Sequence, residues 1–347
     1  MPAKRKIIVA PLNWGLGHAS RSVPIIRLLL EQNFEVLLAS DGDALQLLQL
    51  EFPELSRFEL PSYNIEYGNH FAYSVLKRVP HILSTIQKER QTIEAIAQNT
   101  GAEIIISDNR YGCYTSFTKN IFVCHQHHLL VPVFSDLANS LHQKLLRKFE
   151  QHWIPDREET ETKLGGQLST SNLHNVSYIG SLSRFQKMET AKKYDCIAVI
   201  SGPEPQRSYF EAIIKDQFSA SALKTLLVCG KATEVSPEKQ IGNCTTVPFL
   251  NAAQLNQAIC ASDVVICRSG YSSVMDLAVL EKKVIFIPTP GQTEQEYLAE
   301  YFQQKNVAPC YKQSDFELNT ALMEVKKYSG FHSFEGKNNL RTIIAQL

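Results

Sequence analysis

The chain has 347 residues, with 35 Lys and Arg against 35 Asp and Glu, so its formal net charge is zero. At about 100–200 residues per domain this length predicts two domains. The zero charge argues against a protein that mainly binds nucleic acid, which normally carries an excess of basic residues. The eight cysteines form no Cys-x-x-Cys pair, so we expect a reduced, cytoplasmic protein with neither a zinc ribbon nor a disulfide framework.

The sequence contains no segment that we expect to cross a membrane or to direct export. The apolar run Ile7–Leu12 is too short for the core of a signal peptide, and no stretch of about 18 apolar residues occurs. The stretches Val75–Leu83 and Leu141–Phe149 mix apolar and basic residues. They suit peripheral contact with the inner face of an anionic membrane. More often, such stretches are amphipathic helices that pack on a core and expose a basic face.

Short β-branched runs alternate with longer helical patterns in the first half of the chain. A strand at Ile7–Pro11 is followed by a glycine turn and a helix from about His18 to Gln32. Further strands are predicted at Phe34–Ala39, Glu103–Ser107, Ile121–Cys124, His152–Pro155 and Val176–Ile179. Near-continuous apolar strands separated by helices are typical of a parallel sheet covered on both faces. We therefore expect a doubly wound α/β domain over residues 1–182, with the polar stretch Arg157–Ser171 at its surface.

A second series of strands follows the polar, basic stretch Ser183–Lys193. Its members are predicted at Cys196–Ile200, Thr225–Cys229, Thr245–Val247, Val264–Cys267 and Val284–Ile287. This pattern predicts a second doubly wound domain over residues 183–330, facing the first across a cleft, with ligands at the carboxyl ends of the strands. Residues 331–347 include a helical stretch, at about Gly336–Leu347, that can pack back on the first domain.

The first motif is the turn after the first strand, where Asn13 to His18 reads Asn-Trp-Gly-Leu-Gly-His. Glycine lets the backbone pass close to a ligand, and the N-terminus of the following helix suits an anion. His18 can serve there as a general base or hydrogen-bond donor, or it caps the helix. The spacing is not Gly-x-Gly-x-x-Gly, so a dinucleotide-binding turn is not specifically indicated. An ordinary tight turn is the alternative.

The second motif is the loop after the first strand of the second domain, which begins at Ser201-Gly202 and ends at Gln206-Arg207. The side chains of Ser201, Gln206 and Arg207 can hold phosphate oxygens, with the arginine supplying a fork of donors. The alternative is a rigid surface loop, because two prolines stiffen this segment.

The third motif spans two consecutive strand ends of the second domain. The turn Arg268–Gly270 follows a strand and opens a helix, whose N-terminus can hold a diphosphate. Asp276 stands further along this helix, where a carboxylate can accept hydrogen bonds from ribose hydroxyls. The next strand ends in a loop that carries Gln295, whose amide suits the hydroxyls of a sugar. Each feature alone can also be structural.

Two further strand ends of the first domain carry polar side chains. Asp108 follows the strand at Glu103–Ser107 and is an acid or base candidate, with an ordinary turn as the alternative. The segment Cys124–His128 holds a cysteine and three histidines, which are good metal ligands. On a strand, however, His125 and His127 share a face while Cys124 and His128 point away. We therefore expect no metal there, but either the lining of an acceptor site or a plain strand end.

The third motif resembles the donor-binding half of GT-B glycosyltransferases, in particular the family-28 group, which includes the N-acetylglucosaminyltransferase of peptidoglycan lipid-intermediate synthesis. In that family an Arg-Ser-Gly turn opens the helix below the diphosphate, and an acidic residue six positions after the glycine binds the ribose. The resemblance assigns these roles to Arg268, Ser269, Gly270 and Asp276, where the family usually has Glu at the last position. The amide pair that holds the donor sugar corresponds to Gln295-Glu296, whose second member is an acid here.

The first domain resembles the same family in two places. The family's glycine turn ends in a histidine, as Gly17-His18 does here, and Cys124–His127 is similar to its His-Glu-Gln-Asn segment. We expect Gly17 and the loop residues of the second motif (Ser201, Gly202, Gln206, Arg207) to contact the nucleotide sugar as well. The resemblance also implies that the acceptor side is lined by Asn13, His125, Gln126 and His127.

The resemblance implies an inverting glycosyltransferase that needs neither a metal nor another cofactor. Its donor is expected to be a nucleotide-diphosphate sugar, with UDP as the nucleotide and UDP-N-acetylglucosamine as a candidate. The acceptor is left open among a lipid-linked sugar, a glycan and a small metabolite. His18 is the first candidate for the base and Asp108 the second. Two alternatives are a nucleotide-sugar hydrolase on the same scaffold and a non-catalytic nucleotide-sugar-binding protein.

Overall fold

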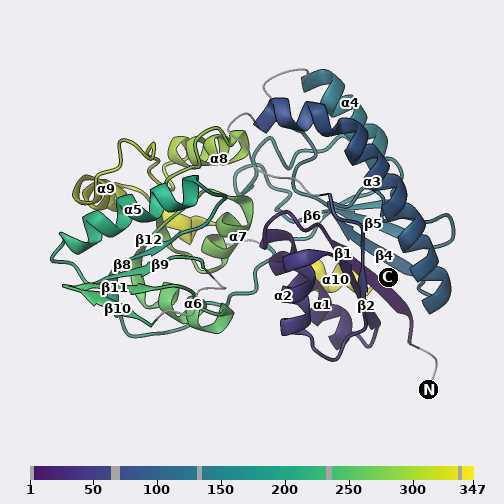
Figure 1. The fold of residues 1–347 in the computed structure, drawn as a ribbon, viewed down its shortest axis with the longest axis horizontal. Helices are drawn as coiled ribbons and strands as arrows, with labels where there is room; N and C mark the ends of the chain where they lie inside the picture. Colours follow the sequence, from purple (N-terminus) through teal and green to yellow (C-terminus); the bar gives the residue numbers. More distant parts are fainter. Residues whose placement is uncertain (1–3, 64–70, 131–134, 232–236, 335–337) are drawn as a thin grey trace. The chain divides into compact units, whose positions relative to one another are not determined.

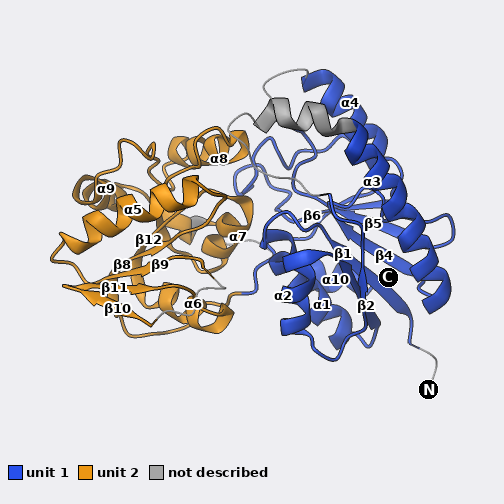
Figure 2. Ribbon diagram, in the orientation of Figure 1, with its two compact units in different colours: residues 1–184, 336–347 blue, residues 185–335 orange. Residues whose placement is uncertain are grey.

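The chain divides into two compact units, residues 1–184 together with 336–347, and residues 185–335 (Figure 2). The structure is a computed structural model that describes residues 4–63, 71–130, 135–231, 237–334 and 338–347, with the backbone alone at 71–79. The chain leaves the first unit at Arg184 and returns to it at its C-terminal end. Both units are α/β structures built on sheets that are mainly parallel, so the predicted fold class is confirmed.

The first unit contains a seven-stranded parallel sheet in the order β3-β2-β1-β4-β5-β6-β7. Its strands are β1 (Lys6–Pro11), β2 (Glu35–Ser40), β3 (Arg57–Glu59), β4 (Ile104–Asp108), β5 (Lys119–Val123), β6 (Gln151–Ile154) and β7 (Val176–Tyr178). The β-branched runs of β1 and β4 form strands because helices bury both faces of the sheet.

Helices cover both faces of this sheet. They are α1 (Gly17–Glu31), α2 (Gly42–Glu51), α3 (Phe71–Thr100), α4 (Ser135–Leu146) and α10 (Leu340–Ile344). Ile93, Ile96 and Ala97 of α3 pack on Ile8 and Ala10, alternate residues of β1. Figure 1 shows α1 and α10 on the other face.

The second unit contains a six-stranded sheet in the order β10-β11-β9-β8-β12-β13. Its strands are β8 (Tyr194–Val199), β9 (Thr225–Val228), β10 (Lys239–Ile241), β11 (Cys244–Val247), β12 (Ser262–Cys267) and β13 (Lys283–Phe286). All neighbours are parallel except β10, which runs antiparallel to β11. The helices are α5 (Gln206–Ser219), α6 (Ala252–Cys260), α7 (Tyr271–Val279), α8 (Thr293–Gln304) and α9 (Leu318–Glu324), followed by the 3-10 turns Val325–Lys327 and Gly330–Ser333. Phe210, Ile214 and Phe218 bury one face of α5 against β8 and β9.

The stretch Arg157–Ser171, expected at the surface, is partly buried. Leu164 and Leu168 are wholly inaccessible to solvent. The buried carboxylate of Asp156 accepts hydrogen bonds from the backbone N–H groups of Leu164 and Gly165, both at 2.8 Å. Polar composition was a poor guide here, because a single buried carboxylate holds this segment against the unit.

The strand expected at Ile121–Cys124 ends one residue earlier, at Val123. Cys124 to His128 therefore form a loop, and the alternation that we used to separate His125 and His127 from their neighbours does not apply. Cys124, His125 and His127 are all buried, whereas His128 is exposed. The physical reason is that the loop turns back into the unit, where the backbone N–H of His127 donates to the carbonyl of Leu168 at 2.8 Å.

The C-terminal helix α10 belongs to the first unit. Its residues Leu340 and Ile344 are buried, and Arg341 forms an ion pair with Glu31 of α1. The helix is shorter than the stretch expected at Gly336–Leu347, of which residues 336 and 337 lie outside the described residues.

Candidate active site

A histidine and a carboxylate meet at the carboxyl ends of the two central strands of the first unit. The order of strands reverses between β1 and β4, because β2 and β3 lie beyond β1 while β5 to β7 lie beyond β4. In open α/β sheets, ligands bind at such a switch point. Asp108 ends β4, and His18 lies in the first turn of α1, which follows β1. His18 Nδ1 lies 2.8 Å from Asp108 Oδ1.

Arg21, for which the sequence yielded no prediction, completes this group. Its Nε donates to Asp108 Oδ2 at 2.6 Å, and its Nη2 donates to Asp108 Oδ1. Its Nη1 lies 3.0 Å from Nδ1 of His125. The signal that can reveal such a residue is spacing, because Arg21 follows His18 by three positions and so shares a helix face with it.

Burial and charge together set the protonation of this group. Burial raises the pKa of Asp108, but the charges and hydrogen bonds of Arg21 and His18 outweigh burial and lower that pKa to about 2. Burial lowers the pKa of His18, and the charge of Arg21 lowers it further, against the opposing effect of Asp108. At neutral pH the group therefore consists of a carboxylate, a guanidinium and an uncharged imidazole.

This arrangement favours His18 over Asp108 as the group that exchanges a proton with a ligand. The His18 side chain is 12% exposed, whereas the Asp108 side chain is 1% exposed. Both oxygens of Asp108 accept hydrogen bonds from Arg21. A carboxylate held in this way orients a histidine rather than acting as a base itself.

The structure ties Asn13 to the start of α2. Its Nδ2 donates to Asp41 Oδ2 at 3.1 Å, and its Oδ1 accepts from the backbone N–H of Ala44. Gly42 has a φ of +49°, and a Cβ there would lie 2.4 Å from Asn13 Nδ2, so the glycine allows this close approach. Asn13 thus fixes the loop that precedes His18.

The segment from His125 to His127 lies at the carboxyl end of β5. His125 contacts Arg21, whereas His127 lies 2.9 Å from the hydroxyl of Ser171 and packs edge-on against His152. The carbonyl of Gln126 accepts from His142 Nε2 at 2.8 Å, and its side chain is half-buried. Of the four residues expected on the acceptor side, His125 contacts the group around His18 through Arg21. Among the described residues, no three His, Cys, Asp or Glu side chains gather as metal ligands do.

The second unit has its own switch point, between β8 and β12. The loop that begins at Ser201 and Gly202 follows β8, and the turn Arg268–Gly270 follows β12. Gly270 is the N-cap of α7, and a Cβ built on it would meet no atom within 4 Å. The start of α7 therefore has space beside it for an anion.

Arg268 and Ser269 bind the protein itself. The guanidinium of Arg268 is buried, donates to the carbonyls of Ile287, Pro288 and Gln206 at 3.0 Å, and stacks 4.2 Å from the ring of Phe210. Burial lowers the pKa of Arg268 to about 10. Ser269 is also buried, and its hydroxyl donates to the carbonyl of Gln295. Both side chains position the loops around α7.

The loop after β8 is more exposed. Ser201 and Gly202 are exposed, and Gly202 has a φ of +107°, which favours glycine. Arg207 forms an ion pair with Glu204 and donates to the carbonyl of Cys229 at 3.1 Å. The side chain of Gln206 accepts a hydrogen bond from Gln313. A phosphate would therefore compete with protein partners for these two side chains.

Gln295 and Glu296 lie in the first turn of α8 and organise the loop before it. Gln295 Oε1 accepts from the backbone N–H of Thr289 at 2.8 Å, and Glu296 Oε1 accepts from that of Gly291 at 2.9 Å. Asp276 lies in the second turn of α7 and is half-buried. Asp276 follows β12, as Gly270 does, and Gln295 and Glu296 follow β13. Because β12 and β13 are parallel neighbours, all of these residues lie beyond the same edge of the sheet.

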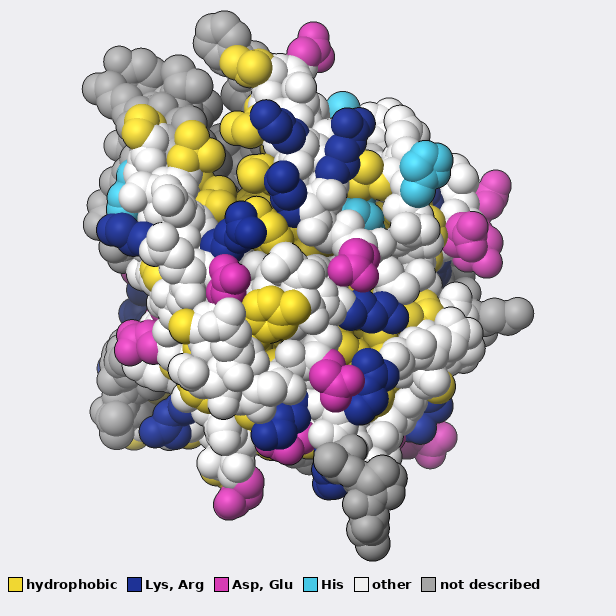
Figure 3. Space-filling model, turned by 90° about the vertical axis from the view of Figure 1, so that its right-hand side faces the viewer, with side chains coloured by type: hydrophobic (Ala, Val, Ile, Leu, Met, Phe, Trp, Pro, Cys, Tyr) yellow, Lys and Arg dark blue, Asp and Glu magenta, His cyan; other side chains and the backbone are white. Residues whose placement is uncertain are grey.

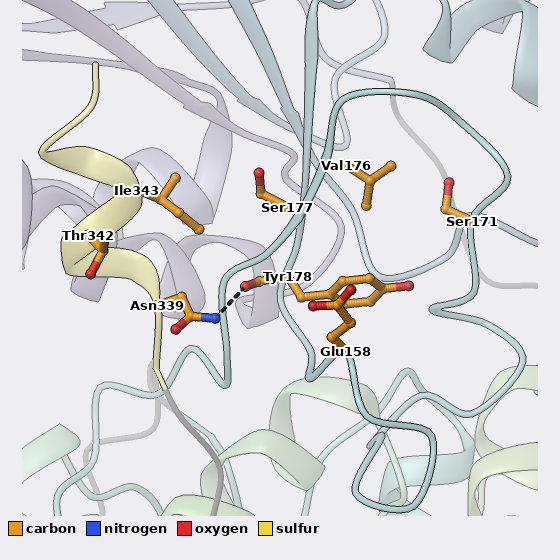
Figure 4. Close-up of a pocket in the computed structure, with 8 residues that line it drawn as sticks. All are labelled: Glu158, Ser171, Val176, Ser177, Tyr178, Asn339, Thr342 and Ile343. Atoms are coloured by element: carbon orange, nitrogen blue, oxygen red, sulfur yellow. Dashed lines mark hydrogen bonds between the residues drawn. The ribbon is translucent and has the colours of Figure 1, made fainter.

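A hollow of about 410 Å³ lies in another part of the first unit, where α10 passes β7 (Figure 4). Tyr178 and Asn339 line it, and Asn339 Nδ2 donates to the carbonyl of Tyr178 at 3.5 Å. None of its lining residues belongs to the predicted sites. It is open to solvent, and we assign the chemistry to the strand ends instead.

The amphipathic stretch Leu141–Phe149 packs on the core. Leu146 and Phe149 are buried in a cluster with Phe122, whereas Lys144, Arg147 and Lys148 are exposed. On the face in Figure 3, Lys and Arg side chains stand near hydrophobic ones, and acidic side chains are scattered over the same face. The described helices include none long and apolar enough to cross a membrane. The side chains of Val75 to Val79, in the other stretch, lie outside the described residues.

Residues 196–334, most of the second unit, match the model of the glycosyltransferase family 28 C-terminal domain. An uncharacterized glycosyltransferase of Methanopyrus kandleri is 22% identical over 315 residues, which are 84% of this chain and 86% of that protein. The UDP-N-acetylglucosamine–N-acetylmuramyl-(pentapeptide) pyrophosphoryl-undecaprenol N-acetylglucosamine transferase of Flavobacterium psychrophilum is 33% identical over 112 residues. These are 31% of this chain and 29% of that enzyme.

The likeness to solved structures extends over the whole chain. The crystal structure of MurG from Acinetobacter baumannii superposes with a TM-score of 0.63, covering 99% of this chain and 99% of that one, at 11% identity. At this identity the likeness concerns the fold.

Proposed function

We propose a reaction for this chain on the premise that it is a family-28-like glycosyltransferase with the GT-B fold. Its fold and its class of enzyme are as the sequence predicted. The proposed reaction moves a sugar from a UDP-sugar to an acceptor hydroxyl with inversion at the anomeric carbon. The observation that carries the proposal is the contact between His18 and Asp108 at the switch point of the first unit.

His18 is proposed to be the general base. With its Nδ1 proton donated to Asp108, the ring has its lone pair on Nε2 and is uncharged at neutral pH. Nε2 takes the proton of the acceptor hydroxyl while the acceptor oxygen bonds to the anomeric carbon. The bond between that carbon and the diphosphate oxygen breaks, and its electron pair leaves with UDP. Attack from the face opposite the leaving group gives inversion.

The second unit is proposed to hold the donor. The N-terminus of α7 supplies free N–H groups and the positive end of a helix dipole to the diphosphate, which favours its departure without a metal. Asp276, with Gln295 and Glu296 nearby in the fold, suits the ribose and sugar hydroxyls. UDP as the nucleotide and N-acetylglucosamine as a candidate sugar follow from the name of the Flavobacterium psychrophilum relative.

Calorimetric titration of UDP into the protein, with EDTA present, tests the donor site. We expect saturable binding that Asp276→Ala weakens by about 1–3 kcal/mol, the usual range for a hydrogen bond to a charged group. Asp263→Ala is a matched control, because Asp263 is an exposed carboxylate at the opposite end of β12 and pairs with Lys192. It should leave UDP affinity unchanged.

Other outcomes point to the alternatives. If GDP, CDP or dTDP binds and UDP does not, the proposed identity of the donor nucleotide is wrong. If UDP binds only when EDTA is absent, the proposed metal independence is wrong. Full-rate release of UDP from the donor with no acceptor would favour a hydrolase. Tight donor binding without turnover over a panel of acceptors would favour a binding protein.

A further inference from the structure

Arg21 lies among three groups at the carboxyl ends of the central strands of the first unit. Its side chain is 2% exposed, and an arginine is rarely so buried unless it is paired. Two of its nitrogens contact the two oxygens of Asp108, and a third contacts Nδ1 of His125. Only a planar fork of donors can make these contacts together.

Three atoms meet at the centre of this group, namely Asp108 Oδ1, His18 Nδ1 and Arg21 Nη2. His18 Nδ1 lies 2.8 Å from each of the other two. A guanidinium only donates hydrogen bonds and a carboxylate only accepts them. With a proton on Nδ1, the carboxylate oxygen accepts from both nitrogens. With a lone pair on Nδ1, that atom would accept from Arg21 Nη2 but would face the carboxylate oxygen at 2.8 Å. The first arrangement is the stronger one, because hydrogen bonds to a carboxylate are stronger than those to a neutral acceptor. The arrangement therefore favours a neutral ring whose lone pair is on Nε2.

The charges at this centre differ from those of an isolated Asp–His pair. In such a pair, the carboxylate is the partner of a protonated ring and stabilises it. Here Arg21 already neutralises Asp108, and it also faces His18 directly. The titratable and charged groups that face His18 are Arg21 on its own helix, Asp108 at the end of β4 and His125 after β5. Of these, Arg21 and, to a lesser extent, His125 oppose a positive charge on His18, and Asp108 favours one.

We propose that Arg21 is the positioning residue of this centre, which orients Asp108 toward the Nδ1 proton and cancels its charge, so that His18 remains an uncharged base. The proposal rests on the proposed function, in which Nε2 of His18 takes the proton of the acceptor. It gives Arg21 two separable effects, one on the tautomer of His18 and one on the pH at which the ring becomes charged.

NMR titration of histidine rings labelled with ¹³C and ¹⁵N, with His18 assigned from the spectrum of His18→Gln, measures both effects without a substrate. In the wild type we expect His18 to titrate below 6.5, the ordinary midpoint, and the neutral ring to carry its proton on Nδ1. Arg21→Gln removes the cation and should move the midpoint to higher pH. Arg21→Lys restores the charge without the fork and should move the midpoint back toward the wild-type value.

Arg27→Gln is the matched control, because Arg27 lies on the same helix but pairs with Glu51 at its exposed side. It should leave the titration of His18 unchanged. A folded Arg21→Gln variant with an unchanged or lower midpoint overturns the proposal. A wild-type midpoint at or above 6.5, or a neutral ring protonated on Nε2, overturns it as well, without requiring Arg21→Gln to fold.

The pH profile of turnover separates this inference from the proposed function. If His18→Ala retains wild-type turnover, the proposed base is wrong, whatever the titration of His18 shows. Suppose instead that His18→Ala is inactive, and that Arg21→Gln changes neither the titration of His18 nor the acid limb of the pH profile of kcat/KM. His18 is then supported as the general base, and the proposed role of Arg21 is wrong.

Discussion

His18 acquires its chemical character from groups that are distant in the sequence. Asp108, with which it forms a contact of 2.8 Å, lies 90 residues further along the chain. The two meet because parallel strands β1 and β4 are neighbours and end at the same edge of the sheet. A histidine with a lowered pKa and an oriented ring is the form of this residue that can accept a proton at neutral pH.

His18→Ala should reduce turnover of the donor by about 10²- to 10⁴-fold, the usual contribution of a general base. UDP affinity should stay near the wild-type value, because the proposed donor site belongs to the other unit. UDP release over a panel of acceptors and calorimetric binding of UDP measure the two quantities. His174→Ala, at an exposed histidine of the same unit, is the control. Wild-type turnover in His18→Ala would remove this residue from the mechanism.

The sequence indicated the positions of His18 and Asp108, since both follow strands, but not the contact between them. A strand end can be read from a hydrophobic run, whereas the neighbour of a strand depends on the order of the sheet. Arg21 was missed because its spacing from His18 places it on the same helix face but does not show that its side chain is buried against Asp108. Arg268 is a second example. The resemblance places it at the diphosphate, and in the structure its guanidinium is buried and donates to backbone carbonyl groups. That the predicted donor residues, Arg268 included, bind the nucleotide sugar stays a prediction.

At the scale of elements, three of the histidines buried around the ends of β5 and β6 have a clearly lowered pKa. His127 follows β5, His152 lies on β6, and His142 lies on α4 and bonds to Tyr111 and to the carbonyl of Gln126. Burial lowers the pKa of His127 to about 3 and those of His142 and His152 to about 4. Each ring is therefore neutral in the folded chain over a pH range in which the unfolded chain binds a proton.

These histidines should make the free energy of unfolding fall as the pH drops from 6.5 to about 4. In that window the unfolded state binds more protons, so stability rises with pH, by about 1.4 kcal/mol per pH unit for each fully shifted ring. Urea unfolding at pH 7.5 and 5.5 measures the difference. His127→Gln should reduce it, whereas His174→Gln, at an exposed ring, should not. Equal unfolding free energies at both pH values would contradict the lowered pKa values of these three histidines.

Most elements were predictable because their hydrophobic pattern is strong. Central strands such as β1 and β4 are runs of β-branched residues, and the sequence located them to within two residues. The edge strands β3 and β10 were missed, since each has only three residues and β10 is fully exposed. The strand predicted at Ile121–Cys124 is one residue too long at its end, because Cys124 continues the apolar run of β5. Beyond it the backbone N–H of His127 bonds to the carbonyl of Leu168, a long-range contact that sequence periodicity does not report.

At the scale of the whole molecule, the last residues of the chain complete the first unit. Leu340 and Ile344 of α10 are wholly buried, and α10 packs on α1, the helix that carries His18 and Arg21. Arg5 near the other end of the chain donates to the carbonyl of Leu347 at 2.5 Å. The stability of the unit that holds the proposed base therefore depends on residues that follow the second unit in the sequence.

Ile344→Ala should destabilise the first unit by about 2–5 kcal/mol, because it leaves a cavity where a fully buried side chain stood. Hydrogen exchange followed by mass spectrometry should then show faster exchange in peptides from α1 and α10, with residues 185–335 unchanged. Gln346→Ala, at an exposed position two residues later, should leave exchange as in the wild type. UDP affinity should be retained in both variants, because the residues that the proposed function assigns to the nucleotide belong to the second unit. Faster exchange in residues 185–335, or loss of UDP binding in Ile344→Ala, would show that the C-terminal helix supports the donor site as well.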